Sequence, residues 1–132
     1  MKTKVFTPII ICATLLLASA CGSSKEKQIK ENIYGRWISQ GFVLPDNTRT
    51  NFTDLDDYSI FEFNANGYAI IYFERIKEIY ECKFVIKGDK ISFKTESGEH
   101  LEVKIESINA NEMVMIMRGE ENEAKIYYKK RK

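Results

Sequence analysis

The feature that most constrains the fold is residues 78–108, which predict three consecutive β-strands joined by turns that fix their pairing. The first turn is the two-residue loop Gly88-Asp89, of the kind that closes a tight hairpin, and it places Phe84 opposite Phe93. The second turn is assigned to residues 96–98, because a loop of only two residues would place Phe93 opposite a glutamate instead of a leucine.

These pairings give the three strands one apolar face and one charged face, because successive side chains in a strand point to opposite sides of the sheet. The apolar face is expected to contain Phe84, Ile86, Ile91, Phe93, Leu101, Val103 and Ile105. The opposite face carries mainly lysine, glutamate and serine. We therefore expect one side of this sheet to pack in a core and the other to meet water.

Five further segments have the β-branched and aromatic content of strands. They are residues 34–40, 58–64, 68–74, 113–118 and 124–130. Eight strands with mostly short connections predict an all-β fold, an eight-stranded antiparallel up-and-down barrel whose interior is filled by side chains or holds one small ligand. The alternative is an open sheet or half-barrel of five to eight strands.

The strand expected at residues 68–74 is apolar on both faces, so the sequence leaves its register open. Tyr68, Ile70 and Tyr72 form one apolar row, and Ala69, Ile71 and Phe73 form the other. A second apolar row on the outside would need a cover, and we expect the N-terminal segment or the final strand to supply it.

Residues 1–20 predict an export signal, since two lysines precede an apolar run that is too short to span a membrane. The run ends in Ala18-Ser19-Ala20 directly before Cys21, and this junction resembles the signal of bacterial lipoproteins. The resemblance implies cleavage before Cys21, acylation of that cysteine with palmitate-type chains, and an anchored position in the bacterial cell envelope, expected at the outer membrane. An ordinary secretory signal is the alternative.

Cleavage would leave residues 21–32 as a polar tether, of which residues 27–33 can form a short helix, and residues 33–132 as one barrel domain. Loss of the two leader lysines turns the formal net charge of +1 into about −1, which argues against nucleic acid as a partner. Cys82 would be the only free thiol, so we expect no disulfide within the chain.

The sequence offers no set of residues for catalysis or metal binding, and we expect neither an enzyme nor a cofactor. His100 is the only histidine, so no Ser/His/Asp set and no histidine-based metal site can be assembled. His100 follows a turn on the charged face and is expected at the surface. Cys82 lies on the apolar face, where a small buried hydrophobe is expected rather than a nucleophile.

Three stretches resemble the small lipocalin-like domains of bacterial envelope lipoproteins. They are Gly35-Arg36-Trp37, the strand–turn–strand of residues 61–68, and the polar bend within residues 105–115. The resemblance implies that Gly35 and Trp37 close one end of the barrel after a short N-terminal helix. It also implies an arginine packed on the tryptophan, with Arg118 as the best candidate.

Closure of one end would leave function to the open end, where we expect residues 45–57 to form a flap over the mouth. A ligand would then lie between this flap and the inner aromatic and methionine rows. The candidate ligand-binding residues are Phe61, Phe63, Tyr80, Phe84, Phe93, Leu101, Met113, Met115 and Met117.

Two functions fit this sequence. One is a lipid-anchored module that binds a small apolar or amphipathic molecule. The other is a solid barrel that recognises another envelope protein, as an inhibitor or an assembly subunit. A cavity of about 300 Å³ or more beneath the flap would favour the first, and a packed centre would favour the second.

Overall fold

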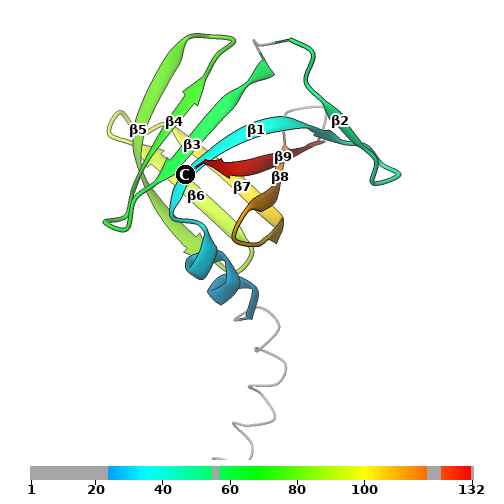
Figure 1. Cartoon of the computed structure of the whole chain (residues 1–132). Helices are drawn as coiled ribbons and strands as arrows, with labels where there is room; N and C mark the ends of the chain where they lie inside the picture. Colours follow the sequence, from blue (N-terminus) through cyan, green and yellow to red (C-terminus); the bar gives the residue numbers. More distant parts are fainter. Residues whose placement is uncertain (1–23, 55–56, 119–122, 132) are drawn as a thin grey trace, which may run out of the picture.

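A computed structural model describes residues 24–54, 57–118 and 123–131, and it shows an antiparallel sheet that curls into a barrel (Figure 1). The strands are β1 Gly35–Val43, β2 Arg49–Asn51, β3 Ser59–Phe63, β4 Tyr68–Phe73, β5 Glu78–Lys87, β6 Lys90–Thr95, β7 His100–Ile108, β8 Glu112–Arg118 and β9 Glu123–Arg131. Each strand from β3 to β8 pairs with the strand that follows it, and β1 pairs with both β3 and β9. The predicted eight-stranded closed barrel is therefore confirmed, with β2 as a short addition to β1.

The registers predicted from the two turns are confirmed. Phe84 lies opposite Phe93 across β5 and β6, and Phe93 lies opposite Leu101 across β6 and β7. The second turn is closed by the Thr95 N–H, which donates to the Glu99 carbonyl over 3.0 Å. Turn chemistry and side-chain alternation were together sufficient to fix three strands.

The centre of the barrel is packed with apolar side chains, several of which are almost fully buried. The largest of them are Trp37, Tyr128, Phe61, Phe63, Phe93, Ile29, Ile33, Ile91, Ile105, Met113, Met115 and Val103. The aromatic rings pack on one another, with ring centroids 5.7 Å apart for Phe61 and Phe93 and 5.2 Å apart for Phe63 and Phe84. Interiors packed in this way exclude a ligand from the centre.

One end of the barrel is closed by a helix over residues 24–32, which lies against the strand ends in Figure 1. The helix buries Ile29, and Ile33 immediately after it is also fully buried. The indole Nε1–H of Trp37 donates to the Ile33 carbonyl over 2.7 Å, so the tryptophan ties the helix end to β1. Trp37 has no exposed surface, as predicted for a residue that closes the barrel.

The basic side chain that packs on this tryptophan is Lys130 and not Arg118. The Lys130 ammonium lies 4.9 Å from the centroid of the Trp37 ring and donates to the Asn32 carbonyl over 2.7 Å. Arg118 is instead exposed at the other end of the barrel, where it pairs with Glu123. The prediction of Arg118 was wrong because the sequence does not show which strand end reaches the tryptophan.

Gly35 is required by this closure, because its backbone has a positive φ of 123°. L-residues with a side chain rarely adopt this conformation, whereas glycine does so readily. The turn at Gly35 changes the direction of the chain between the helix and β1, and it leaves the Lys130 side chain room to pass at 3.5 Å from where a Cβ would lie.

Two polar contacts fix the helix to the barrel beneath it. The Gly88 N–H donates to the Glu26 carboxylate over 2.7 Å, and the Lys25 ammonium donates to the Glu106 carbonyl over 2.5 Å. The hydrogen bond from Gly88 and the neighbouring Lys30 lower the pKa of Glu26 below its usual value. Residues 24–32, expected as part of a tether, are thus packed onto the folded body.

The predicted flap contains a short strand and folds beside β1 and β9. β2 pairs with the last three residues of β1, where Gly41 lies so close to the Thr50 carbonyl that no side chain would fit. The Arg49 guanidinium lies 4.9 Å from the centroid of the Tyr127 ring on β9. It also pairs with Glu112 at 2.6 Å. This segment therefore covers part of the outer wall.

The ambiguous register of β4 is resolved with Ala69, Ile71 and Phe73 directed inward. Their partners Cys82 and Tyr80 on β5 also face inward. The row of Tyr68, Ile70 and Tyr72 is on the outside. The cover expected over this row is not found among the described residues, because β9 is part of the barrel wall and the helix closes its end. Tyr68 remains 47% exposed.

Candidate functional site

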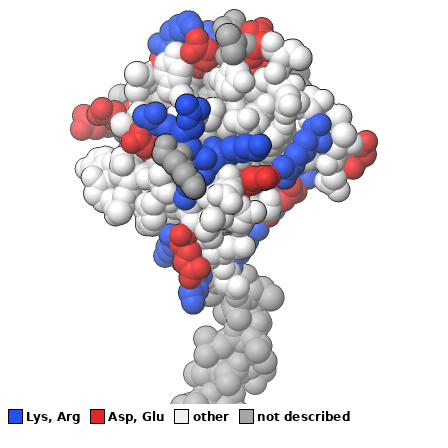
Figure 2. Space-filling model, viewed as in Figure 1, with Lys and Arg blue, Asp and Glu red and all other residues white. Residues whose placement is uncertain are grey.

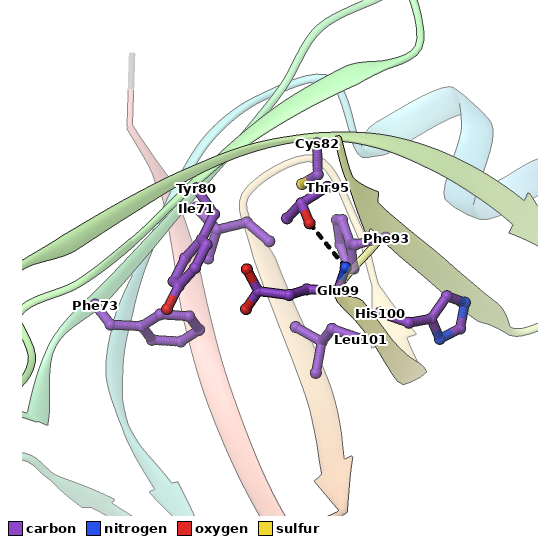
Figure 3. A pocket seen from close by; sticks show the side chains of 9 residues that line it. All are labelled: Ile71, Phe73, Tyr80, Cys82, Phe93, Thr95, Glu99, His100 and Leu101. Carbon is purple, nitrogen blue, oxygen red and sulfur yellow. Dashed lines mark hydrogen bonds between the residues drawn. The ribbon is translucent and has the colours of Figure 1, made fainter. Parts of the chain in front are cut away.

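A cavity of about 200 Å³ lies at the open end of the barrel, opposite the helix (Figure 3). Its lining residues are Ile71, Phe73, Tyr80, Cys82, Phe93, Thr95, Glu99, His100 and Leu101. They come from the last half of β4, the first half of β5, the end of β6, the turn that follows it and the start of β7. Most of them are apolar, and Phe93 forms a buried floor.

The cavity exists because neighbouring strands differ in length. β5 starts at Glu78, but its pairing with β6 starts only at Cys82, which lies opposite Thr95. The hairpin of β4 and β5 therefore extends beyond the turn that joins β6 to β7, as Figure 1 shows at the upper left. Phe73 and Tyr80 line the part of the hairpin that projects, with ring centroids 6.1 Å apart. The space beneath them is bordered by Leu101 of β7, but β6 ends before it can fill the gap beside residues 78–81 of β5.

Polar groups gather at one side of this cavity. The Glu99 carboxylate points into the space between Tyr80 and Leu101 in Figure 3. The Glu99 N–H donates to Thr95 Oγ1 over 3.0 Å, and its carboxylate accepts a hydrogen bond from Ser97 Oγ at 3.1 Å. These contacts hold the start of β7 so that an acidic group faces an otherwise apolar pocket.

Tyr80 brings a second carboxylate to the rim, since its hydroxyl donates to Glu78. This hydrogen bond, together with burial and the charge of Glu99, raises the pKa of Tyr80 above its usual value. The His100 ring is turned away from the cavity in Figure 3, consistent with the predicted surface position. The site therefore has apolar walls and a negatively charged rim.

The structure separates the nine candidate ligand-binding residues into two groups. Tyr80, Phe93 and Leu101 line the cavity. The other six belong to the packed core or lie against it, with Met117 only partly buried: Phe61, Phe63, Phe84, Met113, Met115 and Met117. The inner rows run the length of the barrel, and only their members near the short end of β6 reach open space.

Sequence reasoning did not select Ile71, Phe73, Thr95 and Glu99 as site residues. Ile71 and Phe73 were on the strand whose register was open, so their direction could not be assigned. Glu99 follows the second turn, and a turn glutamate is expected to be solvated. The available signal was the unequal length of the two predicted strands of residues 79–87 and 90–95.

The expected position of the binding surface beneath residues 45–57 is not supported, since none of the described residues 45–54 and 57 lines the cavity. The segment lies beside β1 and β9, whereas the cavity is formed by β4 to β7 across the barrel mouth. Phe42 and Phe52 pack edge to face with ring centroids 4.8 Å apart, which holds the segment against β1.

Below the mouth, two serines and a tyrosine form a buried polar cluster between β1, β3 and β9. Ser39 Oγ accepts a hydrogen bond from the Ser59 N–H at 2.8 Å, and Ser59 Oγ lies 3.2 Å from the Tyr128 hydroxyl. Burial raises the pKa of Tyr128 far above its usual value, and the hydrogen bond to Ser59 opposes this shift. Each buried polar group has a partner, so the cluster stabilises the fold.

Cys82 borders the cavity but is only 4% exposed. Burial raises the pKa of its thiol, so the reactive thiolate is disfavoured. Across residues 24–54, 57–118 and 123–131, no three His, Cys, Asp or Glu side chains are placed to hold a metal ion. None of the helices in these ranges has the length and hydropathy needed to cross a bilayer.

Basic side chains gather on the face of the barrel seen in Figure 2, interspersed with acidic ones. Several of them have an acidic partner, such as Arg36 with Glu62 and Lys125 with Glu106. Exposed pairs of this kind contribute at most about 1 kcal/mol each. This face thus presents basic side chains with acidic ones between them, whereas the rim of the cavity presents carboxylates.

A comparison with known protein families finds a match that covers most of the barrel. The profile described as a lipocalin-like domain matches residues 33–115, from the end of the N-terminal helix to the middle of β8. This range includes all residues that line the cavity. No curated protein and no solved structure matches the chain.

Proposed function

Because this chain belongs to the lipocalin-like domain family, we propose that it binds a small apolar or amphipathic molecule at the open end of its barrel. The observation that carries this proposal is the cavity of about 200 Å³ with apolar walls and a carboxylate at its rim. A pocket with mostly apolar walls and a few convergent polar groups is the usual form of a small-molecule site.

The size of the cavity limits the ligand. Pockets for drug-sized ligands have volumes of roughly 300–1,000 Å³, so this cavity takes a smaller molecule or only the apolar part of a larger one. A water molecule occupies about 30 Å³ in the liquid, and on this scale the cavity admits on the order of seven heavy atoms. A short alkyl chain fits this volume.

The rim favours a polar end that is neutral or positively charged. The carboxylates of Glu78 and Glu99 lie at the mouth, where they would repel an anionic headgroup and accept hydrogen bonds from a cationic one. The apolar end of the ligand would lie on Ile71, Phe73 and Leu101. The ligand proposed here is thus a small amphiphile with its donor group at the barrel rim.

The direct test is to titrate hexylamine, hexanol and hexanoate against the purified domain by calorimetry. Binding of the amine or the alcohol tighter than about 0.1 mM, equivalent to some 5.5 kcal/mol, would support the proposal. Leu101→Trp should fill the cavity and weaken this binding at least tenfold. Tyr34→Trp adds the same side chain at an exposed position near the closed end and should leave binding unchanged.

We also propose that the chain is a lipid-anchored envelope protein that carries acyl chains on Cys21. Support comes from the apolar leader and the small residues directly before this cysteine. Two or more chains hold a protein on a membrane far more firmly than one. Cys21→Ser should release the protein into the soluble fraction of the cell envelope. Retention of this variant in the membrane fraction would contradict lipidation at Cys21.

The packed centre of the barrel favours a second candidate function, an interaction module that recognises another envelope protein. Phe61, Met113 and Met115 are at most 1% exposed, so a large ligand has no room inside. If the amines, alcohols and acids all fail to bind, while the domain forms a stoichiometric complex with one envelope protein, this second function replaces the first.

A further inference from the structure

One stretch of strand β5 has no neighbouring strand on one side within the described residues. Residues 78–83 pair with β4, but only residues 82–87 pair with β6. Beyond Thr95, which lies opposite Cys82, β6 ends and the chain turns back into β7. The edge of residues 78–81 is therefore open where an additional strand would continue the sheet.

The tight hairpin between β5 and β6 determines which backbone groups face this open edge. In a two-residue hairpin, the residues next to the loop exchange both hydrogen bonds, and here these are Lys87 and Lys90. The direction of bonding then alternates along the strand. The odd-numbered residues of β5 accordingly bond toward β6. The even-numbered ones bond toward β4, and the Phe84 N–H indeed donates to the Gly67 carbonyl over 3.0 Å.

By this alternation, the N–H and C=O groups of Ile79 and Glu81 point to the open edge. No hydrogen bond of these groups with the rest of the described chain is found. Unpaired backbone groups along a strand edge form a template for another extended chain. Ile79 is also 65% exposed on the outer face.

Beside this edge lies a surface groove of about 880 Å³ that joins the cavity described above. It follows the outer side of β5 and β6 past Tyr68, Val85 and Ser92 to the turn at residues 96–99. The groove and the cavity share the lining residues Tyr80, Cys82, Thr95, Glu99 and His100. A chain lying in the groove could therefore place one side chain inside the barrel.

The open edge has an excess of negative charge. Glu78, Glu81, Glu96 and Glu99 lie along it or on the facing turn, and no Lys or Arg of the described chain forms an ion pair with any of them. The nearest lysines in the groove, Lys83 and Lys94, lie farther along, where β5 and β6 are paired. The charge at this edge fits a basic partner.

We propose that an extended peptide segment of another protein pairs with the open edge of β5 and inserts an arginine into the cavity. A residue opposite Tyr80 would point inward, as Tyr80 does. Its aliphatic stem would lie on Ile71, Phe73 and Leu101, and its guanidinium would meet Glu99. The peptide residues on either side of the arginine would form backbone hydrogen bonds with Ile79 and Glu81. This inference goes beyond the proposed function, since it concerns a polypeptide on the strand edge.

The backbone groups of Ile79 and Glu81 favour a peptide over other occupants. A lipid or a short amphiphile can fill the cavity, but it cannot satisfy donors and acceptors spaced along a strand. A second copy of this chain paired through the same edge would bring glutamates of β5 against one another, and like charges on neighbouring strands are destabilising. An external basic segment has neither difficulty.

The experiment uses the capped peptide Thr-Val-Arg-Val-Thr and the exported protein carrying Cys21→Ser. We expect binding tighter than about 1 mM, together with at least tenfold slower hydrogen exchange of the Ile79 and Glu81 amides. Methylation of the two valine backbone nitrogens of the peptide removes donors but keeps all side chains. It should weaken binding at least tenfold, and replacement of the arginine by glutamate should do the same.

On the protein side, Ile79→Pro removes the exposed N–H without removing a ladder hydrogen bond, and it should weaken peptide binding at least tenfold. Ile79→Ala keeps this N–H and should weaken binding less than threefold. Thermal melting of both variants would verify that the barrel is intact.

Unchanged binding of the methylated peptide, unprotected amides at residues 79 and 81, or no binding of the unmodified peptide would each overturn the inference. Hexylamine binding without peptide binding would overturn this inference and leave the proposed function standing. Peptide binding without binding of any hexyl compound would leave it standing and contradict the proposed function.

Discussion

The two ends of the barrel differ in how completely their apolar side chains are covered and their hydrogen-bonding groups are paired. At the closed end, the helix and Ile33 cover the core, the Trp37 indole has an acceptor, and Lys130 crosses the ring. At the open end, β5 extends past β6 and leaves a cavity and an unpaired edge. The closed end therefore supplies stability, and the open end retains groups that can bind another molecule.

The strongest test of this contrast is truncation of Trp37. Trp37→Ala removes a fully buried ring, its hydrogen bond and its contact with Lys130, so unfolding free energy should fall by about 3–5 kcal/mol. Tyr80→Ala at the open end removes a partly exposed ring and should cost about 1 kcal/mol. Urea denaturation of both variants measures the difference. A loss of less than about 1 kcal/mol for Trp37→Ala would contradict the view that the closed end is the main source of stability.

The helix should contribute through Ile29, whose side chain is fully buried. Ile29→Ala is expected to lower the unfolding free energy by about 2–4 kcal/mol, because it leaves a cavity between helix and barrel. The matched substitution Ile76→Ala, at a residue 52% exposed between β4 and β5, should change it by less than about 0.5 kcal/mol. Equal effects in urea melts would mean that the helix does not close the core.

A wall residue of the cavity should tolerate truncation better than a closed-end residue. Leu101 is only partly buried and borders space that is already open, so Leu101→Ala should cost about 1 kcal/mol. The enlarged cavity should also admit longer amines, and octylamine should gain affinity relative to hexylamine. Calorimetry on the variant measures both effects, and a loss of all amine binding would contradict an apolar wall at Leu101.

The smallest expected effect is a pH dependence of helix docking through Glu26. Its pKa is lowered below the usual 4.5 by the Gly88 N–H and by Lys30, so the charged form is favoured in the folded state. The stabilisation of the fold by the charged Glu26 carboxylate is fully present above pH 4.5. It is lost as the pH falls from 4.5 through the lower pKa that Glu26 has in the folded state. The melting temperatures of wild type and Glu26→Gln should therefore differ at pH 6, and the difference should shrink as the pH is lowered below 4.5. A constant difference would assign another role to Glu26.

The parts of the fold that were predictable from sequence are those fixed by local rules. Turn length and side-chain alternation fix the pairing of β5, β6 and β7, because a slip of one residue would place charges in the core. The direction of β4 could not be derived in this way. Both of its faces are apolar, and only the packing of Ile71 and Phe73 beside β5 distinguishes them.

The candidate site was less predictable, because it depends on where neighbouring strands end relative to one another. The inner row that includes Met115 has the same period-two pattern as the residues beside the cavity. Burial separates them: Met115 is covered on all sides, whereas Leu101 borders the space left by the short end of β6. The contact of Lys130 with Trp37 is similar, because it joins positions 93 residues apart that no local pattern relates.

The packed helix also determines how the molecule would stand on a membrane. If Cys21 carries the acyl chains, only two residues lie between the anchor and residue 24, and these three steps along the chain reach at most about 11 Å. The closed end would then rest near the lipid headgroups, and the barrel mouth would open into the aqueous compartment. A molecule that binds at the mouth would have to arrive through water or on another protein, and not by lateral diffusion from the bilayer beneath.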